Sequence, residues 1–156
     1  TIAALAAIAG LVTFKRQASA IARSDTVLEL NRGELRESIQ NIVRDLGTLT
    51  GNGPIDGAEM RDAIDQKLRT DLRRFADARQ SMVHLFGLQT YADIMSEFAA
   101  GERYINRVWS ASTDGYIDEV RTYLERARNQ FQKAREHFHE LAEANRQSSG
   151  LSQASE

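Results

Sequence analysis

Glu136 and His139 form the spacing in this sequence that comes closest to a metal-binding pattern. An E-x-x-H pair places a carboxylate and an imidazole on one helix face, as in the di-metal centres of ferritin-like bundles. Such a centre needs a second pair and two more inward glutamates. The facing helices offer Glu59, Glu97 and Glu102 without a partnered histidine. His137 and His139 are two residues apart and so point to different sides of a helix. We interpret the group as a solvated charged face and predict no metal site.

The other common signatures of catalysis are missing from the sequence. It contains no G-x-S-x-G, G-x-G-x-x-G, P-loop or H-E-x-x-H motif. It also contains no cysteine, which excludes disulfides, thiolate zinc sites and a cysteine nucleophile. His84 lies near the end of a predicted helix, where the helix dipole favours histidine, and we interpret it as structural. The sequence therefore predicts a non-enzymatic protein with no catalytic, cofactor-binding or metal-binding residues and no cofactor.

The charge distribution argues against nucleic acid as a partner. The 20 basic and 22 acidic residues nearly cancel, and no basic block suited to phosphates occurs. One basic cluster could meet anionic lipid, but aspartates interleave with it, so a solvated face is the preferred interpretation. The cluster consists of Lys67, Arg69, Arg73, Arg74 and Arg79, with Asp65, Asp71 and Asp77 between them.

Aromatic residues gather around the joint between the last two predicted helices, where they suit either a protein interface or the end of a core. We expect core packing and keep the interface as the alternative. The residues are Tyr91, Tyr104, Trp109, Tyr116 and Tyr123.

Composition indicates an all-α protein. The chain has 156 residues, which fits one domain with a real core. Apolar residues make up 42%, yet there is one proline and only ten glycines, which favours helices over turn-rich β architecture.

The first 14 residues, TIAALAAIAGLVTF, are uncharged and apolar on all sides, which is typical of a buried or membrane helix. They reach roughly 21 Å, short of the roughly 30 Å of bilayer hydrocarbon. We therefore expect about six further apolar residues before Thr1 to complete a span. Lys15, Arg16 and Arg23 follow, and the positive-inside rule then places the helical domain in the cytoplasm. Residues 1–23 are predicted to be an apolar anchor helix with a basic flank.

Two alternatives to the anchor remain open. The apolar segment could be a helix buried in the core of a soluble bundle. It could also be the remnant of a signal peptide, because Ala18-Ser19-Ala20 resembles an A-x-A cleavage site. In a signal peptide, however, the positive charge precedes the apolar region, whereas here it follows.

Residues 24–147 are predicted to form a helical bundle domain, followed by a polar disordered tail over 148–156. The first helix spans about Asp25 to Leu46, with a possible kink at 31–33, and a glycine-rich loop covers 47–57. Asp56 with Glu59 forms a capping box that opens a second helix, which ends at Gly87. A third helix opens at Thr90 with Asp93, and 110–114 form the next turn.

The predicted inward faces follow the helical period. They consist of Leu28, Leu35, Ile39, Ile42 and Leu46 in the first helix, Met60, Ile64, Leu68, Leu72, Phe75, Met82 and Phe86 in the second, and Ile94, Phe98, Ile105, Val108 and Trp109 in the third.

The fourth predicted helix has the most regular pattern in the chain. Its apolar positions alternate steps of three and four, which is typical of a coiled-coil seam. A seam of this kind packs on its neighbours at a shallow angle, so the sequence predicts an antiparallel bundle of three or four helices. The seam consists of Ile117, Val120, Leu124, Ala127, Phe131, Ala134, Phe138 and Leu141.

The apolar segment, the FKRQ that follows it and the stretch ARSDTVLELNRGELRES resemble the opening of an uncharacterised family of small bacterial single-span membrane proteins. The resemblance covers roughly the first 40 residues. It implies an anchored helical domain in the cytoplasm and carries no catalytic motif.

Together these features predict a membrane-anchored helical interaction module, an accessory subunit of a larger membrane protein complex. Its expected partners are membrane lipid, through the N-terminal helix, and other subunits or further copies of the chain, through helix faces. The alternative is a ligand-sensing four-helix bundle domain of a bacterial membrane receptor.

Overall fold

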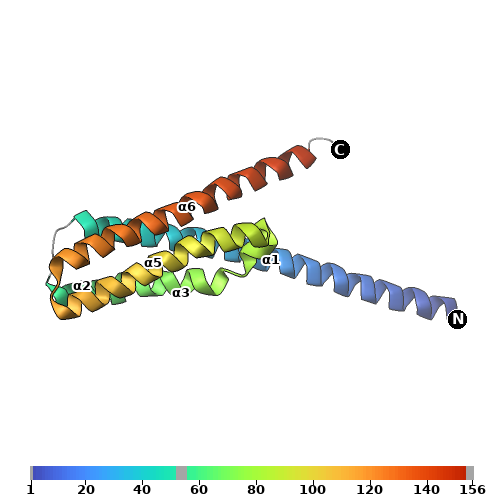
Figure 1. The fold of residues 1–156 in the computed structure, drawn as a ribbon. Helices are drawn as coiled ribbons and strands as arrows, with labels where there is room; N and C mark the ends of the chain where they lie inside the picture. Colours follow the sequence, from blue (N-terminus) through green and yellow to red (C-terminus); the bar gives the residue numbers. More distant parts are fainter. Residues whose placement is uncertain (1, 52–55, 154–156) are drawn as a thin grey trace.

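The computed structural model describes the backbone of residues 2–51 and 56–153 and the side chains of 24–51, 56–144 and 146–148. These residues form four antiparallel arms of a helical bundle (Figure 1). The first arm is α1 (Ile2–Gly51), the third is α5 (Leu88–Asp114) and the fourth is α6 (Ile117–Gln153). The second arm is divided into α2 (Gly57–Ala63), the π-helix η1 (Ile64–Leu68), α3 (Arg69–Ala78) and α4 (Ser81–Phe86). The predicted all-α bundle is confirmed, with four arms.

Each arm packs against two neighbours around one core. α1 contacts α3, α4 and α6, and α5 contacts α6, α2 and α4. The predicted seam of the fourth helix lies in this core, where all its positions from Val120 to Phe138 are buried. The seam is therefore occupied by the chain's own helices.

α5 and α6 approach each other closely at Gly101. A Cβ atom at this position would lie 2.6 Å from the ring of Phe131, so a side chain here would displace that ring. Phe131 in turn packs edge-on against Phe98, which stacks on Phe75 of α3 with ring centroids 4.3 Å apart. Such aromatic pairs add stabilisation beyond the area that they bury. One glycine thus lets three arms share a single aromatic cluster.

The second arm confirms the predicted start and inward face but not the predicted single helix. Asp56 caps α2, its carboxylate accepting a 2.8 Å hydrogen bond from the amide of Ala58. In η1 the amide of Arg69 bonds to the carbonyl of Ile64, five residues back instead of four. A turn at 79–80 then separates α3 from α4. The wider π turn inserts one residue, which shifts the face that the following helix presents.

Two predicted loops are shorter than expected or absent because helices extend into them. Of the predicted loop 47–57, residues 47–51 belong to α1 and Gly57 begins α2, whereas 52–55 lie outside the described residues. α1 extends to Gly51, since Leu49 is buried and the Thr50 hydroxyl bonds to carbonyls of its own helix. α5 continues through 110–114 because Ala111 and Ser112 are buried, and the Ser112 hydroxyl bonds to the Val108 carbonyl. Packing and these local hydrogen bonds outweigh the weak helix propensity of Gly, Ser and Thr.

Glycines with positive φ form the corner between α4 and α5 and the corner between α5 and α6. Gly87 ends α4 where predicted, but with φ 85° and ψ 167° it lies outside the left-handed helical region. α5 begins directly after it at Leu88, ahead of the predicted start at Thr90. Gly115 adopts the left-handed helical conformation after α5, with φ 77°. Residues with a Cβ are strained at such φ values, which explains the use of glycine.

The N-terminal end of α1 and the C-terminal end of α6 extend past the common core (Figure 1). The N-terminal part of α1 projects from the bundle as a lone helix, and it continues through 31–33 without interruption (Figure 1). Among the described residues, no helix combines the length and apolar character needed to cross a membrane. α6 reaches Gln153 and so includes much of the predicted disordered tail; residues 154–156 lie outside the described part.

We predict that Gly101→Ala destabilises the bundle by roughly 1–3 kcal/mol, because the added methyl group overpacks the ring of Phe131. Gly33→Ala is the matched control, since nothing lies within 4 Å of its Cβ position in α1. This change should stabilise the protein by about 0.5–1 kcal/mol through helix propensity. Urea unfolding monitored by circular dichroism measures both.

The cost of Gly101→Ala should shrink in a Phe131→Leu background, because the clashing ring is then absent. Equal effects of the two glycine substitutions would contradict the close approach of α5 and α6.

Candidate functional site

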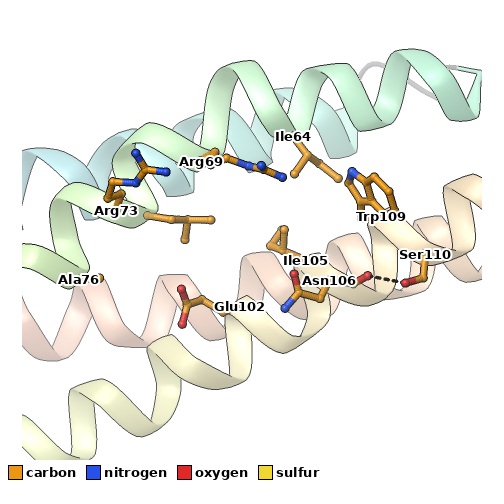
Figure 2. Close-up of a pocket in the computed structure, with 10 residues that line it drawn as sticks. Ile64, Arg69, Arg73, Ala76, Glu102, Ile105, Asn106, Trp109 and Ser110 are labelled. Carbon is orange, nitrogen blue, oxygen red and sulfur yellow. Dashed lines mark hydrogen bonds between the residues drawn. The ribbon is translucent and has the colours of Figure 1, made fainter.

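An open groove runs between the second arm and α5 (Figure 2). Its volume is about 570 Å³. Its floor is apolar, and its rim carries basic, acidic and neutral polar side chains. The floor contains Ile64, Leu72, Ala76 and Ile105, and the rim contains Arg69, Arg73, Glu102, Asn106, Trp109 and Ser110.

The helical period of α5 builds one wall of the groove. Glu102, Ile105, Asn106 and Trp109 follow one another at steps of three, one and three, so they share one face of the helix. Figure 2 shows these side chains projecting from α5 toward the second arm. The Ser110 hydroxyl turns back to its own helix, donating to the Asn106 carbonyl at 3.1 Å.

Two arginines one helical turn apart line the opposite wall. Arg69 pairs with Asp65 on its own arm, and in Figure 2 its side chain extends toward Ile64 and Trp109. Arg73 is exposed and forms no hydrogen bond or ion pair with the described residues. The basic rim of the groove thus keeps at least one guanidinium available for a ligand.

Glu102 lies on the α5 wall, half-buried. Burial raises the pKa of its carboxyl, and the positive charge of Arg79 partly offsets this rise. No hydrogen bond to its carboxylate forms within the described residues. The two walls of the groove therefore carry opposite charge, basic on the α3 side and acidic on the α5 side.

Trp109 stands at one end of the groove. Its side chain is 39% exposed, and the guanidinium of Arg61 lies 6.0 Å from its ring centroid. Arg61 is itself fixed by a 3.1 Å hydrogen bond to the Ser112 carbonyl. The prediction that Trp109 faces the core is wrong, because the adjacent Val108 takes the core position and turns Trp109 to the rim.

No protein-family model, curated protein or solved structure matches the chain.

The basic cluster predicted as a solvated face divides into two parts. Arg74 bonds the carboxylates of Glu34 and Glu37 on α1 and of Asp71 on its own arm, at 2.8–3.0 Å. The bond from Arg74 lowers the pKa of Glu34. Arg74 therefore ties α3 to α1, and of this cluster only Arg69 and Arg73 line the groove.

The residues of the E-x-x-H pattern do not meet the other candidate glutamates. Glu136 and His139 line a shallow hollow between α6 and α1. Glu97 instead contacts His137 at 3.2 Å, Glu102 lies in the groove and Glu59 is exposed on α2. Desolvation, together with the charges of Arg135 and Arg36, lowers the pKa of His139. The described residues contain no group of three or more His, Asp or Glu side chains that could hold a metal ion.

The predicted aromatic cluster also separates. Tyr104 and Tyr123 stack at 6.1 Å across α5 and α6, and the guanidinium of Arg126 lies over both rings. Tyr116 is largely exposed, whereas Tyr91 packs against the core near the start of α5. Core packing therefore describes Tyr91, Tyr104 and Tyr123, whereas Trp109 and Tyr116 are exposed. His84 is exposed near the end of α4.

We predict that Glu102→Gln raises the melting temperature at neutral pH. The pKa of Glu102 is higher in the folded than in the unfolded state. Ionisation of this carboxyl therefore lowers the free energy of unfolding once the pH rises above the usual pKa of a glutamate, about 4.3. Glutamine mimics the protonated form, and the gain should vanish below about pH 4. Thermal melts at the two pH values measure the difference. Glu125→Gln, at an exposed position of α6, is the control, and a loss of stability at neutral pH in Glu102→Gln alone would contradict the desolvation of Glu102.

Proposed function

We propose that the chain is a membrane-associated helical interaction module that serves as an accessory subunit of a larger membrane complex. The observation that carries the proposal is the continuity of α1. One uninterrupted helix leads from the apolar N-terminal segment into the core, where Leu35, Ile39, Ile42 and Leu46 are buried. Because the core end of α1 is held by this buried surface, the helix keeps the bundle at a fixed distance from the surface that its N-terminal end contacts.

The sequence of the projecting end favours lipid as that contact. Its first 14 residues are uncharged, and Lys15 and Arg16 follow at the position where basic side chains reach phosphate head groups. The same charges favour a cytoplasmic bundle. The resemblance of the opening residues to small bacterial single-span proteins points the same way.

The groove supports the interaction role of the bundle. An exposed tryptophan and two arginines stand around an apolar floor, and these residue types contribute most to protein interfaces. The second candidate function is a ligand-sensing bundle domain. It is favoured by the groove volume of about 570 Å³, which lies in the range of small-molecule sites.

We predict that the chain floats with vesicles of phosphatidylcholine and phosphatidylglycerol in a density gradient. Ala6→Asp/Ala9→Asp should abolish flotation, because placing two carboxylates in hydrocarbon costs several kcal/mol. Ala58→Asp/Ala92→Asp is the matched control, with the same substitutions at exposed positions of α2 and α5, and should float like the unchanged chain.

Flotation by Ala6→Asp/Ala9→Asp equal to that of the control would overturn the lipid contact, as would an unchanged chain that stays at the bottom of the gradient. Circular dichroism of the unchanged chain and of both variants establishes that the bundle is folded in each sample.

A further inference from the structure

We propose that the groove between the second arm and α5 binds an acidic amphipathic helix of a partner protein, with the acidic edge of that helix facing α3. The inference rests on the proposed function, since it identifies the partner class of the interaction module. Three features of the groove carry it: its length, the separation of its charges and the exposure of Trp109.

The length of the groove suits a helix of about two to three turns. Its lining residues run from position 102 to 110 on α5 and from 64 to 76 on the second arm. At about 1.5 Å per residue these stretches extend roughly 12 and 18 Å. The groove is open to solvent. A helix laid lengthwise would contact both walls through side chains three and four residues apart.

The charges of the two rims select an acidic helix and fix its rotation. Arg69 and Arg73 lie one turn apart on the α3 rim, and Arg73 has no ion-pair partner among the described residues. Carboxylates at matching spacing on a partner could bond both guanidinium groups. Glu102 on the opposite rim repels the same carboxylates, so the acidic edge must face α3 and the apolar face must turn to the floor.

The apolar part of the groove provides the anchor. Ile64, Leu72 and Ile105 line the floor, and Trp109 closes one end with its exposed ring. Leucine side chains of the partner would cover this ring and exclude water from the arginine contacts beside it. Excluding water strengthens those ion pairs.

Trp109 also supplies the test, because it is the only tryptophan in the chain. The probes are two tryptophan-free 14-residue helical peptides with leucine at the same positions, one with glutamates and one with lysines along the edge. We expect the glutamate peptide to give a saturable blue shift of the Trp109 emission in lipid-free buffer, with an affinity that falls as salt is added. The lysine peptide should give none.

Variants then locate the binding site. Arg69→Gln/Arg73→Gln should weaken the glutamate peptide at least about tenfold, which corresponds to about 1.4 kcal/mol. Arg103→Gln/Arg121→Gln removes two exposed arginines outside the groove and should bind like the unchanged chain. Thermal melts of both variants establish that they are folded.

The inference is overturned if the glutamate peptide causes no shift, if both peptides bind equally, or if the groove variant binds as tightly as the control variant. Because these titrations contain no lipid, their failure would leave the flotation result standing. A failed flotation would likewise leave a positive titration intact.

Discussion

The close packing of α5 on α6 at Gly101 is the constraint on which the rest of the structure depends. The missing Cβ lets the Phe131 ring reach the neighbouring helix, and this ring joins Phe98 and Phe75 in one cluster across three arms. Because α5 is held there from the α6 side, its adjacent side, with Glu102, Ile105 and Trp109, is presented to the second arm and forms a wall of the groove. The core contact and the groove thus belong to the same helix at neighbouring positions.

Polar contacts fix the other wall relative to α1. Arg74 bridges α3 to two carboxylates of α1, and Asn31 donates a 2.7 Å hydrogen bond to Ser81 of α4. Ion pairs with carboxylates this exposed add little stability. The helix that carries these contacts is also the one that extends to the apolar segment. A partner in the groove and a lipid surface at the end of α1 would therefore be linked through one rigid element.

The sequence predicted the bundle well because its core follows simple periodicity. The seam from Val120 to Phe138 and the Asp56 cap depend only on residues close together in the chain. The groove was missed because its walls lie in arms far apart in sequence, and Arg73 looked like one member of a solvated cluster. Trp109 offered one usable signal: it directly follows Val108, about 100° away around the helix, so the two side chains do not both point to the centre of the core. The helical ends at Gly51 and Asp114 depend on burial of Leu49 and Ser112, which local propensity does not reveal.

The most direct test of the central claim, that the α6 seam packs within its own chain, is the melting temperature of Leu124→Ala measured over a wide range of protein concentration. Leu124 is buried in the seam, so its truncation should cost roughly 2–5 kcal/mol, while Glu125→Ala on the exposed face should be nearly silent. The account predicts a lowered melting temperature at every concentration. An unchanged monomer melt combined with a loss of self-association would instead show that the seam is an interface between chains, and would contradict the account.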